Sequence, residues 1–459
     1  MNHTVTKTQI EIHLKDPIPA QFVVGRGQYQ LIQGKIFCAD FCVSDIYINQ
    51  SAKRDCRVEL FSGSEPNILD FFISILWTHA EVGQSHHLAL TLACEEQETK
   101  VFDLGSVDLI DADRVEVGPG SKLGDTPLIA ICLASYNPAG NRLTRQIESI
   151  LCQSYVNWLL IISDDNSDLP HLNEIETLCN LDPRRIRLYR HDQNLGFYRN
   201  FERALKYVPD NAELIAFSDQ DDDWYPEKLQ NLAEELRRET AATLAYSDMR
   251  IVSESGEVIS NTYWQNRKNE YRDFSTVFIA NTVTGAASLF KRELLEVALP
   301  FPQRVGNAFH DHWIACCALS QGKMAYVSEP LYDYIQYNDS VIGQCDFTAK
   351  PLSTRLGNAL SEQREGQTVS AQKWGQVYLY DYLRLQLIAN TLKIRVPVLA
   401  GNIALNLTNG GGGSIFKLML VYLKNRLMQR TTNGAELGLI MGFVRGKGRG
   451  ANCQARDKD

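Results

Sequence analysis

The sequence Leu214-Ile215-Ala216-Phe217-Ser218-Asp219-Gln220-Asp221-Asp222-Asp223 joins an apolar run to a run of acids. The four apolar residues are typical of a strand that is buried on both faces of a sheet. Four carboxylates then follow within five residues, and like charges packed this closely raise each other's pKa unless a cation or solvent relieves them. A solvated loop is the alternative, but the position directly after a buried strand favours a binding site.

Three similar units precede this stretch. Apolar runs at Leu128–Ala134, Trp158–Ile162 and Ile186–Tyr189 each end in polar residues, and apolar residues at helical spacing lie between them. This alternation of strand and helix predicts an α/β domain with a mostly parallel sheet. Ligands bind such sheets beyond the carboxyl ends of the strands, so the polar loops should meet at one crevice.

The polar loops themselves hold the candidate ligand contacts. They are Ser135-Tyr136-Asn137-Pro138, Ser163-Asp164-Asp165-Asn166-Ser167-Asp168, His191-Asp192-Gln193-Asn194-Leu195-Gly196, and Ser218 to Asp223. The first two also have ordinary interpretations, because Asp-Asp-Asn-Ser is a good turn and helix N-cap sequence and Tyr-Asn-Pro can be a turn before a helix. The acidic run is not an EF-hand, since it lacks the glycine at loop position six and the glutamate at position twelve.

The regions on either side of this domain have different patterns. Short apolar or alternating runs separated by turn residues predict a small all-β, sandwich-like domain over residues 1–120, joined through Gly118-Pro119-Gly120-Ser121-Lys122-Leu123-Gly124 to the α/β domain over 125–345. Residues 346–459 are expected to be helical, with a break at Gly410-Gly411-Gly412-Gly413 and a basic end. The β domain either recognises an acceptor substrate or a partner or is a packing or assembly module, and because its sequence shows no site we expect the second.

Composition narrows the class of protein. The 459 residues carry a formal net charge of −9, which argues against a general nucleic-acid binder. The 11 scattered cysteines are typical of reduced thiols in the cytosol, and neither a secretory signal nor a run of about 18 apolar residues is visible. We therefore expect a cytoplasmic protein, whose basic C-terminal end either contacts anionic lipid at the inner face of the membrane or is a solvated tail.

From about Pro127 to Gly343 the sequence resembles the family 2 glycosyltransferases, which have the GT-A fold, and most of all their rhamnosyltransferase-like branch. The resemblance rests on the order and spacing of several stretches: Ala134-Ser135-Tyr136-Asn137, Ser163-Asp164-Asp165-Asn166-Ser167, Asn194-Leu195-Gly196 with Arg199-Asn200, Asp219-Gln220-Asp221-Asp222-Asp223-Trp224, Gly285, Leu299-Pro300-Phe301-Pro302, and His310-Asp311-His312-Trp313.

The resemblance implies an inverting, metal-dependent transferase. The donor would be a UDP- or dTDP-sugar, with dTDP-rhamnose as one candidate, and the acceptor a hydroxyl of a growing bacterial surface glycan such as an O-antigen or exopolysaccharide, free or lipid-linked. Mg²⁺ or Mn²⁺ would bind the D-x-D motif, with Asp221 as the direct ligand and Asp219 beside it.

The same resemblance assigns roles to individual residues. Asp311 would be the general base that accepts the proton of the acceptor hydroxyl, although capping a helix is its ordinary alternative. The nucleotide-sugar would contact Ser135, Tyr136, Asn137, Asp164, Asp165, Asn194, Arg199, Asp219 and Gly285. Tyr136 would lie near the base, Asp164 or Asp165 would accept its N3–H, and Arg199 is otherwise expected to be an exposed helical arginine.

One departure from the family pattern leaves a second function open. Ile335 and Tyr337 stand where the family often has arginine and histidine, so metal affinity would rest on fewer ligands unless His310 or His312 compensates. A glycan-binding or scaffold protein with an inactive transferase domain is therefore the alternative. A nucleotidyltransferase is a third reading, but no Gly-rich phosphate loop lies between Leu128 and Ser149.

Overall fold

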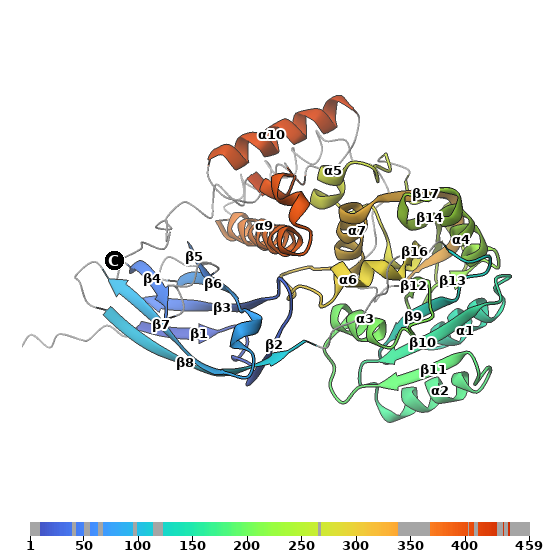
Figure 1. Cartoon of the computed structure of the whole chain (residues 1–459), viewed down its shortest axis with the longest axis horizontal. Helices are drawn as coiled ribbons and strands as arrows, with labels where there is room; N and C mark the ends of the chain where they lie inside the picture. The colour runs from blue at the N-terminus through green and yellow to red at the C-terminus, as the bar shows by residue number, and fades with distance from the viewer. Residues whose placement is uncertain are drawn as a thin grey trace, which may run out of the picture.

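A computed structural model describes residues 10–38, 43–49, 56–62, 68–94, 99–112, 123–264, 268–337, 368–402, 404–407, 412–428, 435 and 439–440. The predicted linker falls outside these residues except for Leu123 and Gly124, and so does most of the basic end. Three bodies follow one another along the chain: a β sandwich, an α/β domain and a pair of long helices (Figure 1).

The α/β domain is built on a nine-stranded sheet with the order β11-β10-β9-β12-β16-β14-β17-β13, and β15 pairs with β14. The four predicted strands form its parallel half: β9 (Ile129–Ser135), β10 (Trp158–Asp164), β11 (Ile186–Arg190) and β12 (Leu214–Ser218). The other strands are β13 (Asp223–Trp224), β14 (Ala242–Ser253), β15 (Val258–Ser260), β16 (Ser288–Lys291) and β17 (Lys323–Gln336).

The predicted mostly parallel α/β sheet is confirmed. Because β16 is antiparallel to both β12 and β14 while β14 and β17 are parallel, six strands run in one direction and β13, β15 and β16 run against them. The residues of β12 are all buried, as expected for a strand covered on both faces.

Helices cover both faces of this sheet (Figure 1). α1 (Arg142–Leu151), α2 (Leu169–Cys179) and α4 (Lys228–Arg238) lie on one face, and α3 (Phe197–Lys206) and α7 (His310–Gln321) on the other. Shorter elements link them: α5 (Phe274–Ile279), η2 (Gly285–Ala287), η3 (Arg292–Leu294) and α6 (Leu295–Ala298). Apolar side chains of α1, including Leu143, Ile147 and Ile150, are fully buried against the sheet.

The N-terminal region is an all-β sandwich, as predicted. One sheet has the order β1-β3-β6-β5 and the other β2-β8-β7-β4. The strands are β1 (Ile10–Leu14), β2 (Gln21–Val24), β3 (Tyr29–Cys38), β4 (Val43–Ile48), β5 (Cys56–Ser62), β6 (Ile68–Leu76), β7 (Ser85–Cys94) and β8 (Thr99–Asp111), with η1 (His79–Glu81) between β6 and β7. Alternate residues of both sheets form a separate apolar core that includes Ile36, Ile73 and Leu90.

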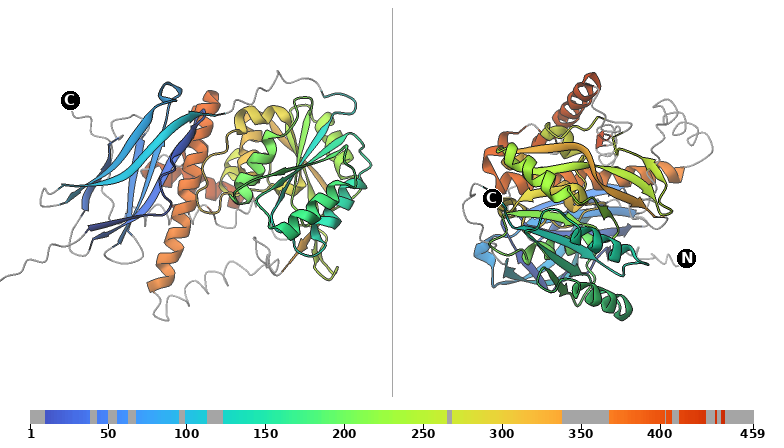
Figure 2. Two further views of the ribbon diagram at one scale, coloured as in Figure 1. Left: turned by 90° about the horizontal axis from the view of Figure 1, so that it is seen from below. Right: turned by 90° about the vertical axis from the view of Figure 1, so that its right-hand side faces the viewer.

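The C-terminal region is helical, also as predicted, with α9 (Thr368–Arg395), η4 (Pro397–Gly401), η5 (Ala404–Asn406) and α10 (Gly412–Leu427). α9 lies between the sandwich and the α/β domain (Figure 2). Arg395 at its end is buried and donates from Nε to the Arg26 carbonyl at 2.7 Å and from Nη2 to the Pro300 carbonyl at 2.7 Å. This guanidinium connects all three bodies.

None of the helices found in the described residues combines the length and the apolar character needed to cross a bilayer.

Candidate active site

The loops after β9 and β12 meet through a single amide side chain. Gln220 accepts at Oε1 from the Tyr136 backbone amide at 3.0 Å and from Ser135 Oγ at 3.2 Å, and its Nε2 donates to the Tyr136 carbonyl at 3.2 Å. The predicted convergence of these two loops is therefore present. The role of Gln220 was not predicted, although a neutral amide inside a run of acids was the available signal.

The loop after β10 joins the same edge of the sheet. Asp164 is fully buried and accepts hydrogen bonds from both the backbone amide and the hydroxyl of Ser167. Ser167 in turn accepts from the Asn137 amide at 2.9 Å, and Asn137 Oδ1 accepts from the Asp168 amide at 2.9 Å. The carboxylate of Asp164 and the side chain of Asn137 thus brace two neighbouring loops, which is the turn interpretation of these sequences.

Asp165 performs a similar task for the loop after β11. Its carboxylate accepts from the backbone amides of Leu195 at 3.0 Å and Gly196 at 2.7 Å, and Arg203 lies 3.4 Å away. Asn194 accepts from the Gly196 amide at 3.1 Å. These bonds hold the N-terminal end of α3, and contact of either aspartate with a base stays a prediction. Tyr136, by contrast, has 47% of its surface exposed.

Arg199 is directed away from these loops. Its guanidinium pairs with Glu202 on α3 and donates to the Phe301 carbonyl at 3.2 Å. The side chain is only 25% exposed, so the expectation of an exposed helical arginine is wrong. Its hydrogen bonds give no support to the predicted donor contact, because they fasten α3 to the segment before α7.

Residues Asp219–Asp223, which we call the acid loop, follow β12 as predicted. Burial raises the pKa of Asp219 to about 7, and the charges of Asp221 and Asp311 add to that effect. Burial likewise raises the pKa of Asp222, which is 1% exposed, well above its usual range, with further contributions from Asp219 and Asp221. The acid loop therefore needs positive charge to hold its carboxylates ionised at neutral pH.

Part of that charge comes from Lys228 at the start of α4. This lysine is fully buried, its Nζ lies 3.6 Å from the Trp224 ring centroid and 4.3 Å from that of Tyr332, and it donates to the Ala286 carbonyl. Its positive charge lowers the pKa of Asp219 and Asp222, while burial lowers its own pKa well below the ordinary value. Lys228 was not predicted, since nothing in its local sequence marks it as buried.

Asp221 is held from the side of α1. Arg145 Nη2 donates to the Asp221 carbonyl at 3.1 Å, and the Tyr337 hydroxyl lies 3.4 Å from the same oxygen. Tyr337 also accepts from Arg145, and the Arg142 guanidinium stacks 3.6 Å above its ring. The tyrosine at the position of the family histidine therefore packs beside the acid loop and works with two arginines.

Asp311 lies in the first turn of α7, close enough to the acid loop for its charge to act on Asp219. Asn281 Nδ2 donates to its Oδ1 at 3.1 Å, and the Gly285 backbone amide is a further donor. Burial raises its pKa to about 7, against the smaller opposite effect of hydrogen bonds from the backbone amides of His312 and Gly285. The helix has no side-chain cap from Asp311, because its N-cap residue is Phe309.

The two histidines around Asp311 are core residues. His312 Nε2 lies 3.1 Å and 3.0 Å from the carbonyls of Val277 and Phe278, and the His310 ring stacks on Phe201 at 3.7 Å. Burial lowers the pKa of both to about 3. The expectation that either compensates for the missing family histidine has no support in these contacts.

Gly285 gives a first prediction, since a Cβ at this position would lie 2.3 Å from His310 Nε2. We expect Gly285→Ala to lower the free energy of unfolding by about 1–3 kcal/mol, because His310 is wedged between aromatic rings and cannot retreat. Urea denaturation measures the change, and Gly401→Ala, whose added Cβ meets nothing within 4 Å, is the control. Equal stability of the two variants would contradict the packing described here.

The acid loop has the donor chemistry of a magnesium or manganese site. Its carboxylate oxygens suit these hard cations, which commonly take one or two carboxylates together with substrate phosphates and water. No group of three or more His, Cys, Asp or Glu side chains is placed to hold a metal in the part of the chain that the structure describes. A cation here would depend on the acid loop and on oxygen atoms brought by the substrate.

Comparison with known proteins identifies the central region. Residues 130–299 match the family model described as Glycosyl transferase family 2. "Uncharacterized glycosyltransferase MJ1057" of Methanocaldococcus jannaschii is 23% identical over 211 residues, which cover 46% of this chain and 71% of that protein. The "UDP-Glc:alpha-D-GlcNAc-diphosphoundecaprenol beta-1,3-glucosyltransferase WfgD" of Escherichia coli is 36% identical over 107 residues, which are 23% of this chain and 40% of that protein.

Among solved structures, TarS 1–349 of S. aureus in complex with UDP-GlcNAc aligns with a TM-score of 0.41 at 15% identity, covering 70% of this chain and 90% of that one. The family match ends before Asp311, and the chain spans less than half of WfgD.

Proposed function

Because the central domain of this chain belongs to glycosyl transferase family 2, we propose that the protein is a metal-dependent, inverting glycosyltransferase that uses a UDP- or dTDP-sugar. The observation that carries the proposal is the proximity of the acid loop to Asp311, because the charge of Asp311 acts on Asp219 and burial raises the pKa of each of these two carboxyl groups to about 7. The acceptor is a hydroxyl of a bacterial surface glycan. The relative WfgD is named as an enzyme that uses UDP-Glc as donor and a diphosphoundecaprenol-linked sugar as acceptor, and this similarity supports the proposed class of substrates.

The proposed mechanism divides the work between two sides of the crevice. Asp219 and Asp221 hold the diphosphate end of the donor, where a bound Mg²⁺ or Mn²⁺ would neutralise the charge that develops on the leaving group. Gln220 fixes the backbone of Tyr136, whose exposed ring covers the nucleotide. Rhamnose as the transferred sugar stays a proposal that the geometry does not address.

Asp311 acts on the acceptor. An ionised carboxylate at this position takes the proton of the attacking hydroxyl, which forms the new glycosidic bond as the bond to the diphosphate breaks. Attack from the face opposite the leaving group inverts the anomeric carbon. The Asn281 amide orients the carboxylate, and the backbone amides of His312 and Gly285 stabilise its charged form.

The donor is tested by ligand-induced stabilisation. We expect UDP- or dTDP-sugars, and not GDP-sugars, to raise the melting temperature when Mn²⁺ is present, because a ligand that binds only the folded state stabilises it in proportion to ln(1 + [L]/Kd). A panel of nucleotide-sugars with and without Mn²⁺, measured by differential scanning fluorimetry, gives the result. Equal shifts with and without the metal would contradict the role of the acid loop.

The pH dependence follows from Asp311. Its pKa is raised to about 7, and the active form of a general base is the ionised one, so kcat should rise with pH through about 7 and level off above it. Initial rates at saturating donor and acceptor measure this profile. The pH range runs from about 5.5 to about 9, which is about 1.5 units below and about 2 units above the pKa of Asp311. A flat profile across this range would exclude Asp311 as the titrating base.

The alternative function is a glycan-binding or scaffold protein with an inactive transferase domain. Tyr337 favours it, because a neutral phenol replaces a ligand that is common in the family. Transfer or hydrolysis of any nucleotide-sugar that depends on Mn²⁺ and is lost in Asp221→Asn would dismiss this alternative.

A further inference from the structure

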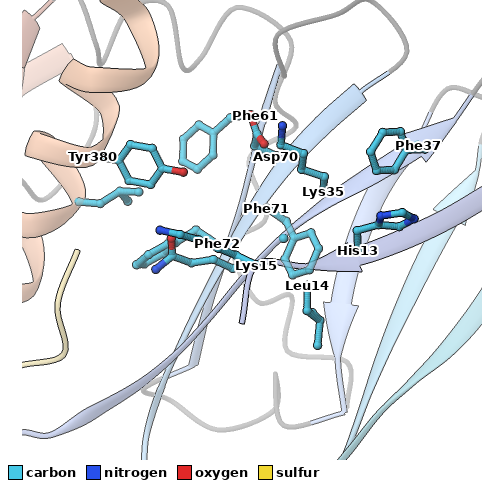
Figure 3. A pocket seen from close by; sticks show the side chains of 13 residues that line it. His13, Leu14, Lys15, Lys35, Phe37, Phe61, Asp70, Phe71, Phe72 and Tyr380 are labelled. Carbon is cyan, nitrogen blue, oxygen red and sulfur yellow. The ribbon is translucent and has the colours of Figure 1, made fainter. Parts of the chain in front are cut away.

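A cavity of about 220 Å³ lies on the sandwich, where α9 covers only part of the outer face of the β1-β3-β6-β5 sheet. Figure 3 shows its lining, which comes from three neighbouring strands and, with Phe61, from β5. Tyr380 and Leu383 of α9 form the opposite wall. The acid loop and Asp311 contribute nothing to this lining, so the cavity is separate from the candidate active site.

The sheet register arranges the lining in rows across the strands. His13 pairs with Lys35, Lys35 with Asp70, and Asp70 with Phe61. Residues directly opposite each other in antiparallel strands point to the same face, so these four side chains form one row. Gln33 and Phe72 pair in the next row, and Lys15 follows β1 beside them. Ile32 and Ile36, which alternate with the lining residues of β3, belong to the sandwich core.

This lining alternates apolar rings with hydrogen-bonding groups. Phe61, Phe72 and Tyr380 offer aromatic surface, while lysine ammonium groups donate, Asp70 accepts, and Gln33 does both. A sugar ring presents the same alternation, since its C–H face is apolar and its rim carries hydroxyls that donate and accept. A peptide strand would instead require an exposed sheet edge with unpaired backbone groups, and the lining of this cavity is a sheet face.

The charge of the lining adds a second property. Lys15 and Lys35 face one carboxylate of the lining, Asp70, so with His13 counted as neutral, as in the charge of the whole chain, the lining residues have a formal net charge of 2 − 1 = +1. The lining is therefore opposite in sign to the chain as a whole, which carries −9. Lys15 Nζ lies 5.4 Å from the Tyr380 ring centroid, which places a cation beside an aromatic wall.

We propose that the cavity between the β1-β3-β6-β5 sheet and α9 binds one or two residues of an acidic oligosaccharide, a part of the acceptor or product glycan remote from the reacting end. The cavity is smaller than the roughly 300–1,000 Å³ of typical small-molecule pockets, which suits a short segment of a longer chain. The identification of the ligand as a glycan rests on the proposed function, whereas the site itself rests on the geometry and charge of the lining. Binding here would retain a growing polymer between additions through effective concentration.

The test is a binding measurement on the full chain. Fluorescently labelled protein is applied to an array of immobilised bacterial polysaccharides, some with uronic acids or phosphodiesters and some neutral. We expect binding to acidic members that weakens with added salt, and a loss of at least about tenfold in affinity for Lys15→Glu/Lys35→Glu, whose side chains are both exposed. Circular dichroism and thermal melting of this variant should match those of the parent. Phe61→Ala should also weaken binding, through loss of an aromatic face.

Two matched controls locate the effect. Lys323→Glu reverses an exposed lysine of β17, and Tyr47→Ala removes a 44% exposed aromatic ring from β4 in the other sheet, and both should bind as the parent does. Asp221→Asn should retain array binding even where it loses sugar transfer, so failure of the proposed reaction and failure of this site give different results.

Several outcomes would overturn the proposal. They are no binding to any acidic glycan, equal binding to neutral ones, or equal binding by the Lys15→Glu/Lys35→Glu variant. Vesicles of phosphatidylcholine with phosphatidylglycerol are tested in parallel. If the parent protein binds these vesicles but no glycan, and the Lys15→Glu/Lys35→Glu variant does not bind them, the cavity contacts a membrane surface instead.

Discussion

Asp311→Asn is expected to lower kcat for sugar transfer by about 10²–10⁴-fold, the contribution of a positioned general base, with little change in donor affinity. The amide keeps the size of the carboxylate and can still accept from Asn281, but it cannot take a proton from the acceptor. Rates of transfer with a radiolabelled donor, together with donor titration by calorimetry, separate the two effects.

The matched control for this variant is Asp125→Asn, an exposed aspartate that lies outside the crevice. If Asp311 is the general base, the residual kcat of Asp311→Asn should no longer rise with pH through about 7. Turnover within a factor of about three of the parent would instead return Asp311 to a structural role.

Lys228→Met is expected to lower the free energy of unfolding by about 3–5 kcal/mol, because it removes the buried cation and leaves Asp222 and Asp219 uncompensated. Methionine fills the space between the Trp224 and Tyr332 rings but cannot bond the Ala286 carbonyl.

A double-mutant cycle with Asp222→Asn tests the cause of this loss. If the effect is electrostatic, Asp222→Asn should restore part of the stability in the Lys228→Met background, with a coupling of roughly 0.5–3 kcal/mol. Additive losses would show that Lys228 acts through packing alone. Lys228→Arg keeps the positive charge but has a larger, planar head group that does not match the space of the lysine. Its stability therefore separates the electrostatic contribution of Lys228 from its packing contribution.

The parallel half of the sheet could be predicted because each strand is a local apolar run with a polar end. β14, β16 and β17 could not be placed in the same way, since their order depends on pairing between segments as far apart as Ala242 and Lys323. The helical region was predicted, but its position between the two domains was not. That position depends on backbone acceptors such as the Pro300 carbonyl, which no residue type reveals.

For the candidate site, the position of a motif at the end of a strand or the start of a helix indicated which side chains lie close together. The residue types within a motif were a poorer indication of which side chains are available to a ligand. Asp219 and Asp221 lie in the acid loop and Asp311 in the first turn of α7, and the structure brings these two segments near each other. Asp164, Asp165 and Arg199 have the residue types of ligand contacts, but their described bonds serve the loops and α3. Gln220 and Lys228 were overlooked because their importance comes from burial and from partners distant in the chain.

The Arg395 guanidinium also bears on how this protein can be divided. Its N–H groups donate hydrogen bonds to the backbone carbonyls of Arg26, Val297, Ala298 and Pro300, and none of these acceptors carries a negative charge. Burial lowers its pKa to about 10, and the charge of Glu202 makes a smaller contribution in the opposite direction. Cutting the chain before α9 would remove this donor and leave four carbonyl acceptors in two folded regions without it. The catalytic domain is therefore not a portable module, and chimeras that exchange it between relatives should carry α9 and the first strands of the sandwich with it.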